Sequence, residues 1–545
     1  MLKFSRKEWQ WTLAVSFLTL GLSSLPLLWG WLATPSGQQY TGLYFNANDA
    51  NTYLAKMLEG RQGAWVFHLM HTSEQGDSGA VTFVFYLLLG KLAGLLSLPE
   101  IVIFHAARLV CGLALLVASY AFIALLFPEI ARRRFTFGLV CFAAGLGWLL
   151  GPFGIQPADF WVAEGYTFQS IFANPHFPLA TALLIAGITG GLLALEGASR
   201  RYYLWTALAA FGLGFVHPFL LFTLGGVLVV FWLRLAFMRH QADWRGLLML
   251  AAAGICGGPG AFLTWWGTLQ DPLLKSWMSQ NQTVTLDLPS MLAAYGLLLP
   301  LALLGGWWVE RTLPRENASL EAKGLLTRWQ LVTTWVIVTV GLQLLPVSFS
   351  RRFVEGLHLP LCCLAAAGWY AFVAPRIKAG WRKLAGGALL GVTALSSLGL
   401  VILSISLLYL PPDTVDPVRS PYFSAGELGA LDWLRNHSSP SDVILTGPVL
   451  GNVLPGRVPV HVFYGHSMET LQADQKLTIL KKFFEKSESN GTRYAIIKNW
   501  GLKYLVYGWR EQRLGGFDPT SAGWPLLYNK DNVRIFLLQS SAGQS

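Results

Sequence analysis

Charged residues are scarce in this sequence. Only 13% of its 545 residues are charged, whereas a soluble domain carries about 25%. Hydrophobic residues make up 53% of the chain. Apolar runs of about 20 residues, the length that a bilayer-spanning helix needs, recur over residues 1–410. The composition therefore indicates a membrane protein and argues against a soluble one.

Cysteine is also scarce, and several common motifs are absent. The region 411–545 contains no cysteine, and all the cysteines of the chain lie in apolar runs: Cys111, Cys141, Cys256, Cys362 and Cys363. Neither a disulfide framework nor a cysteine metal site is therefore expected. The sequence has no glycine-rich phosphate loop, HExxH, CxxC or serine nucleophile elbow. Its chemistry has to come from scattered polar residues.

The apolar runs predict an α-helical polytopic protein. The first run, from Trp11 to about Ala33, is too long for a cleavable signal peptide and lacks a small-residue cleavage site, so we interpret it as a span. About eleven spans are expected in all, near residues 11–33, 101–127, 135–154, 178–197, 202–216, 219–237, 246–267, 289–308, 329–347, 357–375 and 384–409.

Segment 81–97, "VTFVFYLLLGKLAGLLS", is ambiguous, and the positive-inside rule decides its role. If it is a juxtamembrane helix that does not cross, one face of the membrane collects the basic stretches "RKEWQ", "ARRRF", "SRRYY", "RHQADWR", "ERTLPRENASLEAKGLLTRW" and "RIKAGWRK". If it crosses, this asymmetry reverses. We therefore expect a cytoplasmic N-terminus and an extracytoplasmic C-terminal region. The formal charge of +11 then reflects topology, and no nucleic-acid partner is expected.

Residues 411–545 predict a small α/β domain on the outer face, following a transmembrane domain of residues 1–410. The linker "YLPPDTVDP" ends the last span, and Ser424 with Glu427 form a capping-box pattern. Short apolar runs, "DVILTG", "VHVFYGH", "KYLVYG" and "VRIFLLQ", are typical of strands. A helix rich in Lys and Phe is expected over about 468–487.

Asp49 lies in "YFNANDANTYLAKMLEGRQGAW", directly after the first span. A carboxylate there can be a general base that accepts a proton from an attacking hydroxyl. The alternative is a helix cap, because "NAND" supplies good capping residues before an amphipathic turn. The two interpretations are not exclusive.

A second acidic pair, Asp159 and Glu164, lies in the outward loop "PADFWVAEGYTFQSIFANPHFPLA". With His176 nearby, these carboxylates could hold a divalent cation such as Mg²⁺ or Mn²⁺ against phosphate oxygens. The alternative is an interfacial loop whose aromatic residues anchor at headgroup depth. The sequence leaves both open.

Arg351 and Arg352, in "SFSRRFVEGLHLPL", are two adjacent cations in an outward loop. Arginine suits a phosphate that must be held in bidentate fashion near apolar surface. Snorkelling to lipid headgroups is the alternative. His217, in "VHPF", is a weaker candidate, because a packed histidine at a turn between spans is common.

With these features the chain resembles the GT-C superfamily of integral-membrane glycosyltransferases, which includes protein O-mannosyltransferases and the aminoarabinose transferases that modify lipid A. The shared pattern is an N-terminal span, a large first outer loop with juxtamembrane helices, many further spans and a soluble outward C-terminal domain. The stretch "HTSEQGDSGAVTFVFYLLLGKLAG" keeps the juxtamembrane helix and a Gly-Lys pair, but lacks the prolines common in the family.

The resemblance implies a sugar donor linked to a polyprenyl phosphate in the bilayer, and an acceptor hydroxyl on an extracytoplasmic glycan, lipid or protein. Transfer would proceed with inversion. The implied roles are Asp49 as catalytic acid/base centre, Asp159 and Glu164 as second acids at a metal or the sugar phosphate, Arg351 and Arg352 at the carrier phosphate, and His176, His217 and Lys91 as accessory groups. The expected location is a bacterial or archaeal plasma membrane, although the endoplasmic reticulum would give the same topology.

Two other functions remain open. A transporter or flippase of a lipid-linked or amphipathic substrate predicts internal repeats and helices broken near the membrane midplane. A non-catalytic subunit would bind the lipid-linked sugar through the same residues without transferring it.

Overall fold

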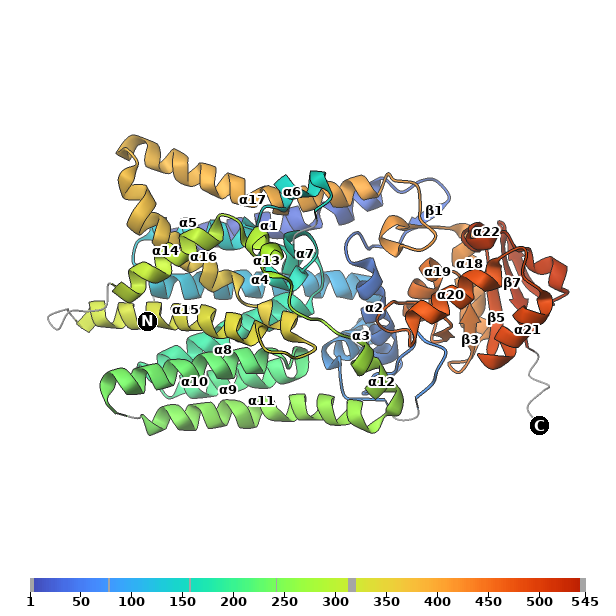
Figure 1. Ribbon diagram of the computed structural model, residues 1–545, viewed down its shortest axis with the longest axis horizontal. Coiled ribbons are helices and arrows are strands. Elements are labelled where there is room, and N and C mark those ends of the chain that lie inside the picture. Colours follow the sequence, from blue (N-terminus) through green and yellow to red (C-terminus); the bar gives the residue numbers. More distant parts are fainter. Residues whose placement is uncertain (1–3, 77–78, 156–157, 242, 312–319, 540–545) are drawn as a thin grey trace. The chain divides into compact units, whose positions relative to one another are not determined.

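The computed structural model describes residues 4–76, 79–155, 158–241, 243–311 and 320–539, and it is mostly helical with a small sheet near the C-terminus (Figure 1). The chain divides into two compact units, which are described separately. The first comprises Met1–Ser24, Ala106–Phe262 and Thr283–Ile402, and the second comprises Leu25–His105, Leu263–Gln282 and Leu403–Ser545. The predicted domain boundary after residue 410 falls within the second unit.

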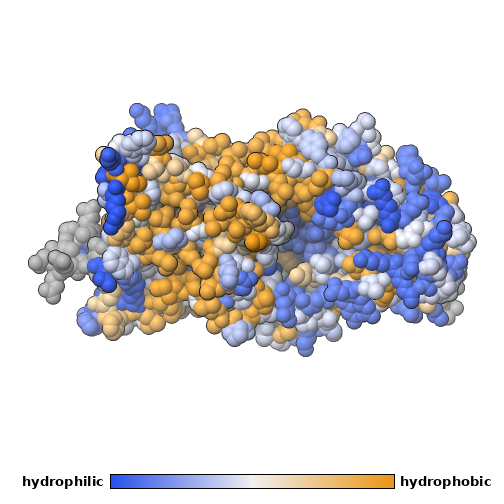
Figure 2. All heavy atoms as spheres, turned by 45° about the horizontal axis from the view of Figure 1, so that its top comes forward, coloured by the Kyte–Doolittle hydropathy of each residue, from blue (hydrophilic) through white to orange (hydrophobic). Residues whose placement is uncertain are grey.

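Within the described ranges, eight helices are long and apolar enough to cross a membrane. They are α1 (Arg6–Leu32), α4 (Glu100–Leu126), α8 (His176–Leu195), α10 (Leu220–Arg239), α11 (Trp244–Gln270), α15 (Leu320–Gln343), α16 (His358–Gly368) with its continuation to Arg376, and α17 (Arg382–Leu407). Their outward side chains form an apolar surface (Figure 2). Phe17, Phe222 and Phe237 are among the exposed residues of these helices. The protein is an integral, multi-pass membrane protein.

Two predicted spans are broken. Near residues 135–154, α5 (Ile130–Phe142) meets α6 (Gly147–Leu150) and a short 3₁₀ turn at 42°. Near 289–308, α13 (Leu288–Tyr295) meets α14 (Leu298–Arg311) at 86°. The second break lies at Gly296, whose φ of +47° is costly for any residue with a Cβ. Counting each bent pair as one span gives up to ten candidates in the described chain.

One predicted span, 202–216, is not among these candidates. It corresponds to α9 (Arg201–Val216), which has 16 residues. At 1.5 Å per residue its length is about 24 Å, short of a bilayer core of about 30 Å. It packs on α8, where Thr206 Oγ1 donates to Gly187 O at 3.5 Å. All the predicted spans therefore coincide with helices, but not all are long and straight enough to cross alone.

The second unit contains the first long loop and the C-terminal region. The loop part includes α2 (Ala47–Arg61) and α3 (Val84–Leu96), and the segment Leu263–Gln282 of the same unit contributes α12 (Pro272–Gln280). α3 has 13 residues, about 20 Å of helix, which is too short to span. Gly60 and Gly90 bring α2 and α3 close together, since a Cβ at either position would collide with backbone of the other helix.

The C-terminal part is built around a sheet with the order β4-β3-β5-β7-β6. Strands β3 (Val443–Leu445), β4 (His461–Val462) and β5 (Leu502–Tyr507) are parallel, whereas β7 (Val533–Leu537) pairs antiparallel with β5 and with β6 (Leu526–Lys530). Helices accompany it: α18 (Ala425–His437), α19 (Pro448–Val453), α20 (Ala473–Phe484), α21 (Asn490–Asn499) and α22 (Trp509–Gly515). The four predicted strands and the capping box at Ser424 and Glu427 are confirmed.

Two connections tie the first loop to the C-terminal part of the same unit. β1 (Gln38–Tyr40) pairs antiparallel with β2 (Tyr422–Ser424). Val462 N donates to Met70 O at 3.2 Å, so the loop after α2 continues the edge at β4. These pairings place α2 against residues from the C-terminal region.

Candidate functional site

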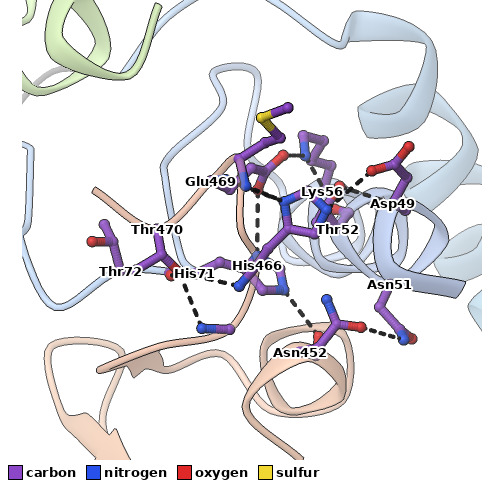
Figure 3. Close-up of polar contacts among 12 residues, drawn as sticks. Asp49, Asn51, Thr52, Lys56, His71, Thr72, Asn452, His466, Glu469 and Thr470 are labelled. Atoms are coloured by element: carbon purple, nitrogen blue, oxygen red, sulfur yellow. Dashed lines mark hydrogen bonds and ion pairs between the residues drawn. The ribbon is translucent and has the colours of Figure 1, made fainter. Parts of the chain in front are cut away.

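Asp49 lies in the first turn of α2, in the second unit. The N-cap residue is Asn46, in a left-handed conformation with φ of 48° and no side-chain cap hydrogen bond. Instead Asn46 Nδ2 donates to Asp49 Oδ2 at 2.9 Å. The other oxygen, Oδ1, lies 3.0 Å from His466 Nε2 (Figure 3). Asp49 is therefore not the cap of α2. It is a first-turn carboxylate favoured by the helix dipole and bonded through both oxygens.

The exposure of this pair is unequal. The Asp49 side chain is 43% exposed, whereas that of His466 is 6% exposed. A solvent-borne hydroxyl can therefore reach the carboxylate, but the imidazole is covered. This geometry suits proton acceptance by Asp49.

A buried ion pair lies farther along α2. Lys56 Nζ lies 2.6 Å from Glu469 Oε1, and the two side chains are 1% and 7% exposed. Lys56 also lies 4.4 Å from the centre of the Phe83 ring. Burial raises the pKa of Glu469, but the ion pair with Lys56 and the contacts with His71 and His466 together outweigh it, and the pKa lies below its ordinary value. Loss of either partner would leave a buried charge, at a cost of about 3–5 kcal/mol.

His71 connects this ion pair to α19. Its Nδ1 lies 3.4 Å from Glu469 Oε2, and its Nε2 donates to Asn452 O at 3.0 Å. Burial lowers the pKa of His71. Asn452 in turn accepts from Asn51 Nδ2 at 2.8 Å through its side-chain oxygen. Polar contacts with C-terminal residues thus extend along α2 from Asp49 to Lys56 (Figure 3).

His466, Glu469 and Asn452 were not predicted as site residues. The only sequence signal is "YGHSMET", where a histidine and a glutamate are three positions apart in a loop. Such a pattern has no periodicity and is common in loops, so the sequence alone does not indicate a site there. Its contacts with α2 become evident only in the structure.

Lys91, the predicted accessory group in this unit, is engaged elsewhere. Its Nζ donates to Gly63 O at 2.9 Å and lies 4.1 Å from the centre of the Trp65 ring. These contacts fix the end of α2 on α3. They give Lys91 a packing role in this structure.

In the first unit, Glu164 and Arg351 come together. Arg351 Nε lies 3.8 Å from Glu164 Oε1, and its guanidinium lies 5.0 Å from the centre of the Trp161 ring. Arg351 also lines a small cavity with Tyr166, Tyr295 and Gln343. The neighbouring Arg352 lies 5.8 Å from the centre of the Phe219 ring. A guanidinium is planar and weakly hydrated, which suits it to phosphate and carboxylate groups near an apolar surface.

Asp159 does not share this ion pair. It is fully buried, its Oδ2 accepts from Gly147 N at 2.9 Å, and burial raises its pKa. Asp159 therefore faces a backbone N–H group, and Glu164 faces the cationic Arg351. Among the described residues, no group of three His, Cys, Asp or Glu is arranged to hold a metal. The residues around this pair do not fit Mg²⁺ or Mn²⁺, and a metal held by Asp159 and Glu164 remains a prediction.

His217 has a carboxylate partner that the sequence did not single out. Its Nδ1 lies 2.6 Å from Glu355 Oε2, and Thr181 Oγ1 donates to Glu355 Oε1 at 3.2 Å. The predicted accessory residue His176 packs beside it, with ring centres 5.8 Å apart. Burial raises the pKa of Glu355. Glu355 lies in the quoted stretch "SFSRRFVEG", four positions after Arg351, but a lone glutamate there gave no reason to choose it.

No family model and no curated protein matches this sequence. Solved structures match in fold. The oligosaccharyltransferase of Archaeoglobus fulgidus, tethered with an acceptor peptide, matches with a TM-score of 0.52 and 11% identity, over 98% of this chain and 74% of that one. The same enzyme, AglB, in complex with an inhibitory peptide and a dolichol-phosphate, gives a TM-score of 0.51 and 10% identity over 99% and 75%.

ArnT from Cupriavidus metallidurans, bound to undecaprenyl phosphate, is a third match, with a TM-score of 0.51 and 12% identity. The alignment covers 99% of this chain and 100% of that one. At such identities the likeness concerns the fold. The predicted resemblance to GT-C glycosyltransferases is confirmed at that level, and it extends over nearly the whole chain.

Proposed function

We propose that the protein is a membrane glycosyltransferase that moves a sugar from a polyprenyl-phosphate-linked donor to an acceptor hydroxyl on the extracytoplasmic side. The fold supports this, because the similar ArnT structure contains undecaprenyl phosphate and the similar AglB structure contains a dolichol-phosphate. The observation that carries the proposal is Asp49, an accessible carboxylate at the start of α2 whose two oxygens are held by Asn46 and His466.

Asp49 acts as the general base. It takes the proton of the acceptor hydroxyl as that oxygen attacks the anomeric carbon of the donor. The new carbon–oxygen bond forms while the bond from the anomeric carbon to the carrier phosphate breaks, and the phosphate leaves with the electron pair. Attack opposite the leaving group inverts the configuration. The proton on Asp49 then passes to solvent, which restores the carboxylate.

Arg351 and Arg352 are proposed, on independent grounds, to bind the phosphate of the lipid carrier. They are adjacent cations in the first unit, and Arg351 lines a cavity whose other walls are mostly apolar. A guanidinium stabilises the charge that develops on a departing phosphate more effectively where water is excluded.

The transporter or flippase alternative has one observation in its favour, which is the pair of broken spans. It requires movement of a lipid-linked substrate across the bilayer without formation of a new glycosidic bond. The same vesicles can measure both processes.

The decisive experiment is sugar transfer in reconstituted vesicles with a panel of polyprenyl-phosphate sugars and acceptors. Asp49→Asn keeps the shape of the side chain but removes the base, so transfer should fall by about 10²–10⁴-fold. Asp474→Asn is the matched control, because Asp474 is an exposed first-turn carboxylate of α20. It should keep wild-type transfer.

Several results would contradict the proposal. Equal transfer by wild type and Asp49→Asn would remove the base role. Donor translocation without any glycosidic product would favour the transporter, and donor binding without either would favour a binding subunit. Retention of the donor's anomeric configuration in the product would exclude the inverting route.

A further inference from the structure

The loop around His466 determines which tautomer its imidazole adopts. Its Nδ1 lies 3.1 Å from the backbone N of both Met468 and Glu469, and both N–H groups point at it. A nitrogen that accepts from two N–H donors carries no proton of its own. The single ring proton is therefore on Nε2, from which it is donated to Asp49 Oδ1.

We propose that His466 is a positioning residue for Asp49, a donor that fixes the carboxylate and does not itself exchange a proton during the reaction. This rests on the proposed function of Asp49 as the base. The reverse arrangement, with the imidazole as base and the aspartate orienting it, needs a ring nitrogen that faces the substrate. Here Nδ1 is covered by backbone N–H groups, Nε2 faces Asp49, and the ring is 6% exposed against 43% for the carboxylate.

The loop that presents His466 is held together by hydrogen bonds to one side chain, Thr470. Thr470 Oγ1 accepts from Gly465 N and His466 N, at 3.1 Å each, and donates to His71 O at 2.6 Å. A side-chain hydroxyl thus closes the loop that spans residues 465–470. The position of the imidazole is therefore determined by backbone and not by a flexible side chain.

The same loop also contacts α2 at a second position. Glu469 reaches Lys56, about two turns farther along the helix from Asp49, through the buried ion pair. Two contacts on one helix prevent the loop from rotating about either of them. Asn46 then holds one oxygen of Asp49 and His466 holds the other. His466 lies 417 positions after Asp49 in the sequence. A carboxylate fixed in this way is preorganised for the attacking hydroxyl.

The test replaces His466 by two amide residues. Each amide restores a different hydrogen-bonding function of the imidazole. In His466→Gln the amide N–H replaces Nε2–H and restores the donor to Asp49. In His466→Asn the shorter amide can accept from the loop N–H groups but cannot reach Asp49. Each variant is assayed as the full-length protein in reconstituted vesicles for kcat, for KM of the donor lipid and for the pH profile of kcat/KM.

His466→Asn should lower kcat by about 10²-fold, since a misplaced reactive group costs that much. The KM for the donor should stay within about twofold, because lipid binding does not involve the ring. The acid limb of its pH profile should move upward by about one pH unit, because a carboxylate that loses an N–H donor holds its proton more tightly. His466→Gln should recover most of kcat and return the acid limb to its wild-type position.

The outcomes separate this inference from the proposed function. If Asp49→Asn is inactive but His466→Asn has wild-type kcat and acid limb, the positioning role is overturned and the base role stands. Equal losses in the Gln and Asn variants with an unmoved acid limb would reduce His466 to a structural residue. If His466→Asn does not fold, His466→Phe, which keeps the ring volume without the donor, takes its place. Activity retained in Asp49→Asn overturns both proposals.

Discussion

At the scale of single residues, the informative groups are charged side chains whose partners limit what they can do. Lys56 and Glu469 neutralise each other in a buried pair, so neither is available for chemistry. Asp49 differs, because N–H groups of Asn46 and His466 bind its two oxygens and its side chain is accessible. Neutral donors stabilise a carboxylate without supplying the counter-charge that would stop it from accepting a proton in the transition state.

Arg352 supports a prediction at the same scale. In the described part of the chain its guanidinium contacts the Phe219 ring but has no carboxylate within ion-pair distance. If it binds the carrier phosphate, Arg352→Gln should raise the KM for the donor lipid by about tenfold, the loss of about one charge-assisted hydrogen bond. The acceptor KM should not change. Steady-state kinetics with varied donor in vesicles measure both.

Arg245→Gln is the control, because Arg245 is exposed in the first turn of α11, within the stretch "RHQADWR" that is predicted to face inward. An unchanged donor KM in Arg352→Gln would assign Arg352 to headgroup snorkelling. Arg351 is a less clean target, since its removal also leaves Glu164 without a cation in its largely buried position.

At the scale of elements, the packing of α2 on α3 determines the position of Asp49. A methyl group at Gly90 would collide with the backbone oxygen of Met57 on α2, and one at Gly60 with that of Leu87 on α3. Backbone cannot yield as a flexible side chain does. The contact therefore requires glycine on both helices.

Gly90→Ala should lower the free energy of unfolding by about 1–3 kcal/mol, the usual cost of overpacking. It should also reduce sugar transfer, because the displaced helix carries Asp49. Thermal unfolding in detergent and the vesicle assay measure the two effects. Gly94→Ala on the same helix is the control, since its Cβ would lie 3.3 Å from Arg61 Cγ, a flexible side-chain atom. A Gly90→Ala variant as stable as Gly94→Ala would contradict the close approach.

At the scale of the whole molecule, the side of the membrane on which each loop lies is the main proposal to test. The positive-inside rule predicts a cytoplasmic N-terminus and extracytoplasmic residues 411–545. The length of α3 supports the view that segment 81–97 does not cross. Both statements concern accessibility, which cysteine labelling measures directly.

Single cysteines at exposed positions should report the topology. An impermeant maleimide added to intact cells should label Gln62→Cys, Leu98→Cys and Ser439→Cys, and should label Gln241→Cys only after permeabilisation. The native cysteines give little background, because four of the five are buried. Opposite labelling of Gln62→Cys and Leu98→Cys, on either side of α3, would mean that 81–97 crosses the bilayer.

The sequence by itself determined what depends on local pattern. Apolar runs of sufficient length can only be helices in a bilayer, because the backbone must satisfy its own hydrogen bonds there. The four apolar runs of the C-terminal region became strands, and Ser424 with Glu427 became a capping box, because both depend on neighbours a few positions away. β6 escaped prediction because its side chains are largely exposed and show no buried alternation.

Only the tertiary structure decided which polar residues meet. Asp49 was predicted from its place after the first span, but its partner His466 lies 417 positions later. The partner of Lys56 is 413 positions away. These partners, His466 and Glu469, lie in a loop without a periodic pattern. Their contacts depend on the segment that packs against the loop, which the local sequence does not reveal. The breaks in two spans were likewise invisible in the apolar pattern, because hydropathy records the solvent that a segment prefers and not the direction in which its helix runs.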